Sequence, residues 1–165
     1  MKLEVAFRRG TLRSLEDTIV MGATFGPYVH SEILLDDQGY SGFEGYSGFM
    51  RSPNKPAPPE WVRLPIRVID ARAVRAAVLD ALAPQLRYNS ADRWQCCVTA
   101  MLPFEADLDC ERPETWVSTG VFCSQAILLI LRRLARAGAI QLNPEPLERT
   151  HSRGCSPNAL YALLA

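Results

Sequence analysis

Alternation of apolar and polar residues predicts two strands near the start of the chain. Leu3, Val5 and Phe7 occupy every second position of the first run and therefore share one face of a strand. Residues 29–35 form the clearest strand, with residues 36–39 as the turn that follows it. Between the two, residues 11–21 carry apolar side chains at helical spacing, which predicts a short helix.

The later part of the chain favours helices. Residues 61–69 read as a strand, and Asp70 is a suitable N-cap for a helix over 71–82. An apolar helix is expected from Cys123 to about residue 137, ending at Gly138, and residues 144–154 are expected to form a loop. A terminal helix over 158–164 follows Ser156-Pro157. The element order predicts an α+β protein.

A short internal repeat follows the predicted turn. Gly39-Tyr40-Ser41-Gly42-Phe43-Glu44 recurs six residues later with Met50 as its last residue. Two such short copies do not make a solenoid. The repeat is interpreted either as a Gly/Ser hairpin or as a loop whose aromatic side chains line a substrate groove.

Size and charge narrow the class of protein. The 165 residues are 48% hydrophobic and 22% charged, so a single domain over 1–165 with its own core is expected. Eighteen basic residues balance eighteen acidic ones, which gives no electrostatic reason to expect a nucleic-acid partner. No long uninterrupted apolar run and no signal peptide are present in the sequence, so we expect no integral membrane segment and a cytoplasmic location.

The cysteine pattern predicts reduced thiols and no metal. The chain has five cysteines, an odd number, and it contains no CxxC motif. His151 and Cys155 are four residues apart, but adjacent Cys96 and Cys97 have poor spacing for tetrahedral zinc. Neither a metal site nor a cofactor is therefore expected.

Cys123 is the candidate nucleophile because it stands where the apolar helix begins. A helix N-terminus offers unpaired N–H groups and a partial positive charge, and both stabilise a thiolate. Ser124 and Gln125 place polar residues in the same first turn, where free N–H groups can bind an oxyanion. The alternative interpretation is that Cys123 is a small core residue.

His30 is the candidate general base, and Glu32 is the candidate carboxylate that orients it. Two residues apart on a strand, their side chains project from the same face. His151, in a polar loop, is the rival base. A strand histidine can also be half-buried without a catalytic role, and Glu32 can be a solvated charge.

These motifs resemble the circularly permuted papain-like hydrolases of the NlpC superfamily, with its YiiX-type, poxviral and lecithin-retinol-acyltransferase-like branches. The resemblance covers the chain from about residue 28 to its end. It rests on His30-Ser31-Glu32-Ile33, Phe122-Cys123-Ser124-Gln125, Arg136-Ala137-Gly138, Tyr88-Asn89 and Ser156-Pro157-Asn158-Ala159-Leu160. Gln125 and Asn89 depart from the glutamate and aspartate that are commoner in the family.

The resemblance implies a central antiparallel sheet packed against helices that include the nucleophile helix. It implies cleavage of an amide bond, such as one in a cell-wall peptide, through an acyl-enzyme on Cys123, with Tyr88 as an extra hydrogen-bond donor. A lipid esterase or acyltransferase using the same residues is the alternative, and a non-catalytic interaction protein that retains the fold is the third reading. A cell-wall target would require delivery by lysis, a phage particle or a secretion system.

Overall fold

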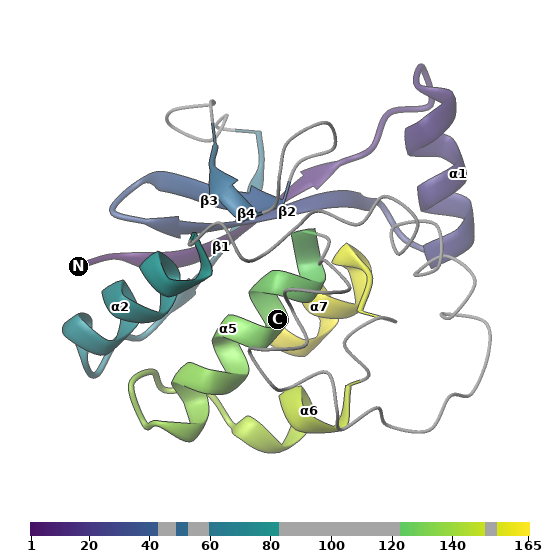
Figure 1. Ribbon diagram of the computed structural model, residues 1–165. Helices are drawn as coiled ribbons and strands as arrows, with labels where there is room; N and C mark the ends of the chain where they lie inside the picture. Colours follow the sequence, from purple (N-terminus) through teal and green to yellow (C-terminus); the bar gives the residue numbers. More distant parts are fainter. Residues whose placement is uncertain (43–48, 53–59, 83–122, 151–154) are drawn as a thin grey trace.

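The computed structural model describes residues 1–42, 49–52, 60–82, 123–150 and 155–165, and these form an antiparallel sheet with helices. The sheet order is β4-β3-β2-β1-β5. Figure 1 shows α2, α5, α6 and α7 together on one side of the sheet, and α1 apart from them at one end of the strands. The predicted α+β class is confirmed. The strands are β1 (Leu3–Arg9), β2 (Tyr28–Leu35), β3 (Gln38–Gly42), β4 (Phe49–Arg51) and β5 (Val62–Ile66).

Strand β1 lies between the central strand β2 and the edge strand β5. Its alternating residues Leu3, Val5 and Phe7 are all buried, as the sequence predicts. The turn between β2 and β3 is tighter than predicted. Asp36 and Asp37 both have positive φ, at 48° and 66°, which is the backbone of a two-residue type I′ hairpin turn. Leu35 therefore pairs with Gln38, and β3 begins inside the predicted turn.

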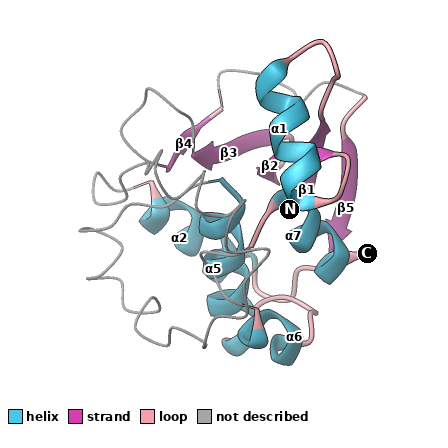
Figure 2. Cartoon of the chain, turned by 90° about the vertical axis from the view of Figure 1, so that its right-hand side faces the viewer, coloured by secondary structure: helices cyan, strands magenta, loops and turns pink. Residues whose placement is uncertain are grey.

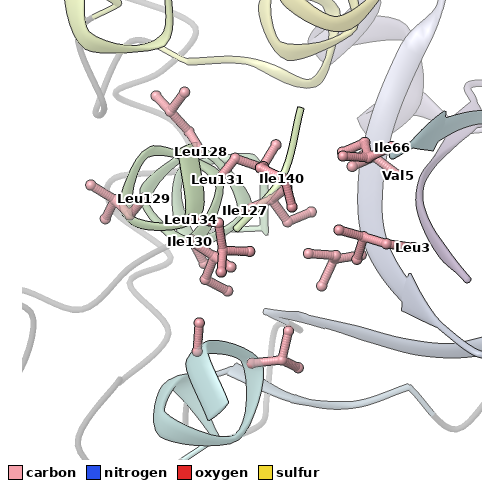
Figure 3. Close-up of a cluster of buried hydrophobic side chains, with 14 of the residues drawn as sticks. Leu3, Val5, Ile66, Ile127, Leu128, Leu129, Ile130, Leu131, Leu134 and Ile140 are labelled. Atoms are coloured by element: carbon pink, nitrogen blue, oxygen red, sulfur yellow. The ribbon is translucent and has the colours of Figure 1, made fainter. Parts of the chain in front are cut away.

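Helix α5 (Cys123–Arg136) forms the centre of the core. All of its residues except Arg133 and Arg136 are buried, as expected of a helix that is covered on nearly every side. Figure 3 shows Leu3, Val5 and Ile66 reaching from the sheet toward this helix. The predicted end of α5 is confirmed, since Gly138 follows it with a φ of +65°.

Two predicted helix caps are confirmed. The Asp70 carboxylate accepts hydrogen bonds from the backbone N–H groups of Arg72 and Ala73 at the start of α2 (Ala71–Ala81). The Ser156 hydroxyl accepts one from Ala159 in α7 (Pro157–Leu164). These bonds satisfy N–H groups that the first turn of a helix leaves without partners.

Helix α6 (Pro144–Arg149) lies where the sequence analysis predicted a loop, so that prediction is wrong. Asn143 caps it by accepting a hydrogen bond from the Glu145 N–H, and Pro144 occupies the first helical position. A buried arginine of α5 binds carbonyl oxygens at the C-terminal end of α6. The Arg132 guanidinium donates to the carbonyl oxygens of Leu147, Glu148 and Thr150. Because this contact joins residues far apart in the chain, the local sequence pattern does not predict α6.

Helix α1 (Leu15–Thr24) begins later than predicted, because the Ser14 hydroxyl caps it by accepting from the Asp17 N–H. Val20 is its buried apolar contact. Leu12 and Leu15 are 84% and 78% exposed, and Ile19 is also exposed. Figure 2 shows this helix at the opposite end of the molecule from α6. In the ranges that the structure describes, no helix has both the length and the apolar content to cross a membrane.

Candidate active site

The first turn of α5 meets the beginning of β2, and Cys123 lies at this contact. Its side chain is 8% exposed. It packs with Val20 of α1, and Ala23 and Val29 pack against this two-residue cluster. The thiol therefore lies where the start of α5 meets α1 and β2, two elements that follow one another much earlier in the chain.

A β-bulge at Val29 sets the direction of the next side chain, His30. Arg9 of β1 opposes Tyr28, and Arg8 opposes His30, so Val29 is an extra residue between two consecutive pairs. A bulge of this kind bends the strand and redirects the side chains beside it. As a result Val29 packs against the cluster of Val20 and Cys123, and the adjacent His30 interacts with the Cys123 thiol.

The edge of β2 is open toward Cys123. Pairing between β2 and β3 ends at Ile33 and Tyr40, and in a regular ladder the next hydrogen-bonded pair would be Ser31 and Gly42. Instead the Ser31 carbonyl accepts a hydrogen bond from the Ser41 hydroxyl at 2.7 Å. The Ser31 backbone N–H faces the Cys123 sulfur, and so does that of Ser124. Two backbone donors thus stabilise the thiolate form of the cysteine.

Glu32 lies beside His30, as the strand alternation predicts. Oε1 of Glu32 is 3.5 Å from Nε2 of the imidazole, and the glutamate side chain is fully buried. The same oxygen accepts a hydrogen bond from the Ser52 hydroxyl at 3.0 Å. The Glu32 carboxylate thus lies beside the Nε2 side of the imidazole, and the imidazole also interacts with the Cys123 thiol.

Electrostatic coupling favours an ion pair between Cys123 and His30. Burial opposes the charged form of the thiol, but the neighbouring imidazolium and the two backbone N–H groups outweigh it and lower the pKa of Cys123 to about 7. Burial likewise opposes the charged imidazole, but the thiolate and Glu32 raise the pKa of His30 to about 9. Between these values the thiolate and the imidazolium coexist.

Trp61 covers the imidazole from the side. Its ring meets that of His30 edge to face, with centroids 5.8 Å apart and planes at 78°. Trp61 is 9% exposed and packs with Ala6 and Leu34. The indole therefore limits the rotation of the imidazole and keeps water from one side of the pair.

The polar residues after Cys123 are turned inward. Ser124 is fully buried, and its hydroxyl donates to the Cys155 carbonyl at 2.5 Å. Gln125 is buried too. Ser124 therefore faces the nucleophile with its backbone N–H and not with its hydroxyl. Cys155 is the second buried thiol of the described residues, and burial raises its pKa to about 12, which leaves it protonated.

Several predicted residues lie outside the described ranges. Tyr88, the rival base His151 and the Cys96-Cys97 pair are among them. Within the described ranges, no three His, Cys, Asp or Glu side chains gather as metal ligands would.

Sequence reasoning missed Trp61, Ser52 and Ser31 as neighbours of the candidate pair. A local signal existed for Ser31, since it stands between His30 and Glu32, but only the early end of the β2–β3 ladder frees its N–H. No local pattern marks Trp61 or Ser52. No protein-family model, no curated protein and no solved structure matches this chain.

Proposed function

We propose that this protein is a thiol hydrolase of permuted papain-like type that cleaves an amide bond through an acyl-enzyme on Cys123. The observation that carries the proposal is the contact between a thiol and an imidazole whose pKa values, about 7 and about 9, support a thiolate–imidazolium pair. A core cysteine and a half-buried histidine without catalytic roles are not expected to shift each other's pKa values in this way.

The residues supply each step of acyl transfer. The thiolate of Cys123 attacks the substrate carbonyl carbon, and the C=O π electrons move onto oxygen. His30, as the imidazolium, then gives its proton to the leaving amine while the C–N bond breaks and a thioester remains. Neutral His30 next takes a proton from water, the resulting hydroxide attacks the thioester, and the acid product leaves Cys123 as thiolate with His30 protonated again.

The start of α5 supplies the charge stabilisation that this chemistry needs. The N–H groups of the first helical turn carry no intrahelical partner, and they point toward the place where negative charge develops. The Ser124 N–H already faces the sulfur. Glu32 holds the imidazole in one orientation through its contact with Nε2.

The test is turnover of a panel of peptide amides, including cell-wall-type peptides, by the full chain and by Cys123→Ala. We expect Cys123→Ala to abolish turnover while its circular dichroism stays that of the native protein. Cys155→Ala is the matched control, because it removes the other described buried thiol and should leave the catalytic pair in place. Full activity in Cys123→Ala would overturn the assignment.

A lipid esterase or acyltransferase is the second candidate, and one observation favours it. Helix α1 contacts Cys123 through Val20, while Leu12, Leu15 and Ile19 present an apolar surface to solvent. Acyl-lipid esters in the same assay separate the two candidates. A protein that labels rapidly at Cys123 yet turns over neither substrate class would favour the third reading, a non-catalytic protein with the same fold.

A further inference from the structure

Three neighbouring strands place Glu32, Gly39 and Ser52 on one face of the sheet. Directly paired residues of antiparallel strands share a face, and Gly39 pairs with Leu34, two residues from Glu32. Ser52 continues the pairing of β4 with β3, because its N–H donates to the Gly39 carbonyl at 2.8 Å. Glu32 and Ser52 therefore flank Gly39 from opposite sides.

Gly39 lets the carboxylate cross β3. A Cβ at this position would overlap Oε2 of Glu32 and would lie 3.1 Å from the Ser52 Cβ. With no side chain in the way, the Glu32 carboxylate lies over the β3 backbone and meets the Ser52 hydroxyl at 3.0 Å. Any other residue at 39 would push the carboxylate away from Ser52.

The two flanking groups are themselves held in place. The Gln38 amide donates to the carbonyl oxygens of Gly39 and Ser52, at 2.8 and 3.3 Å. The Ser41 hydroxyl holds the Ser31 carbonyl between His30 and Glu32. Gly39 and Ser41 both belong to the first copy of the repeat, so the described part of this copy, residues 39–42, contacts the residues on either side of Glu32 and the Glu32 carboxylate itself.

We propose that Ser52 is a positioning residue, which acts through Glu32 and together with the space at Gly39 fixes the carboxylate against the imidazole of His30. The inference rests on the proposed function and assigns a role to part of the repeat. The effect of Ser52 passes through one hydrogen bond to Oε1, the same oxygen that faces Nε2.

Other charged groups near the imidazole are already engaged. Cys123 faces it from α5, and Arg8 opposes it on β1. Arg8 is bound by both carboxylate oxygens of Asp17, at 2.9 and 3.1 Å. Glu32 is thus the carboxylate that steadies the imidazolium, and a displaced Glu32 should lower the pKa of His30 and raise that of Cys123.

The test measures the rate of iodoacetamide labelling at Cys123 by mass spectrometry, from pH 5 to 9, in the full chain. Ser52→Ala is expected to slow labelling near pH 7 about fivefold, the size of one lost hydrogen bond of ordinary strength, and to move the midpoint upward. Glu32→Gln should act in the same direction and more strongly. Asn143→Ala, which removes the remote α6 cap, is the control for a purely structural loss and should leave the profile unchanged.

Gly39→Ala gives an independent variant if Ser52→Ala does not fold. It leaves the Ser52 hydroxyl in place but displaces the carboxylate, and it should reproduce the upward shift. This inference would be overturned if Ser52→Ala kept the wild-type labelling profile while His30→Ala shifted it, and the proposed function would then still stand. If only Gly39→Ala folds, its profile is compared with that of His30→Ala in the same way. An unchanged profile in His30→Ala would overturn both.

Discussion

Nε2 of His30 lies 3.5 Å from Oε1 of Glu32, two residues further along the same strand. The carboxylate is fully buried, so this interaction acts in a medium that screens charge far less than water does. The carboxylate faces one ring nitrogen, and the imidazole also interacts with the Cys123 thiol. Because side chains two residues apart on β2 share a face, Glu32 is placed where it can hold the proposed base, His30, in one orientation.

The coupled pKa values predict a window of activity. Thiolate forms as pH rises through about 7, and imidazolium is lost as pH rises through about 9. Turnover should therefore follow a bell with limbs near these values. In His30→Ala the burial of the thiol acts without a compensating charge, so the labelling midpoint of Cys123 should rise above about 8.5, the value of an ordinary cysteine. A midpoint near 8.5 in both proteins would contradict the ion pair.

Asn158 should support the site from a distance. Its side-chain amide accepts from the Tyr28 N–H and donates to the Tyr28 carbonyl, both at 2.9 Å, just before the bulge that directs His30. Asn158→Ala leaves these backbone groups without their partner and should lower the free energy of unfolding by about 1–3 kcal/mol, measured in urea. It should also slow labelling of Cys123.

Ser156→Ala is the matched control on the same helix. It removes the N-cap of α7 but no contact with β2, so it should cost about 1 kcal/mol and leave Cys123 reactivity unchanged. Equal losses of Cys123 reactivity in Ser156→Ala and Asn158→Ala would mean that reactivity depends on the docking of the whole helix α7, and not on the two hydrogen bonds between Asn158 and Tyr28.

Arg132 and Arg133 should differ sharply in their effect on stability. The buried Arg132 guanidinium holds carbonyl oxygens at the end of α6, and Arg132→Met leaves them unpaired, at an expected cost of about 2–4 kcal/mol. Arg133, next to it, forms an exposed ion pair with Asp80 at 3.1 Å, and Arg133→Met should cost less than about 1 kcal/mol. Similar shifts of the two urea transitions would contradict the role of Arg132.

The exposed apolar side chains at the start of α1 and just before it should contribute little to folding. The double variant Leu12→Ser/Leu15→Ser removes side chains that face solvent and should change the free energy of unfolding by no more than about 0.5 kcal/mol. Leu131→Ala in α5 is the contrast, with an expected loss of about 2–5 kcal/mol from a fully buried position. A loss above about 1 kcal/mol in the double variant would show that these side chains are covered.

Local pattern was sufficient for several elements. The period of two in β1 and β2, the cap at Asp70 and the stop at Gly138 each act within a few residues, so the sequence alone predicts them. Helix α6 was missed because its stability depends on Arg132, which reaches it from another helix. For α1, helical spacing predicted the helix but not which of its apolar residues are buried.

The sequence by itself determined that His30 and Glu32 share a face and that Cys123 stands at a helix start, because strand alternation and helix propensity are local. Only the tertiary structure decided that these residues meet. Their contact depends on the bulge at Val29 and on the Ser31 edge that β3 leaves open. It also depends on Gly39, where a missing side chain lets Glu32 reach Ser52. Such contacts join residues far apart in the chain, so patterns within a few neighbouring residues do not predict them.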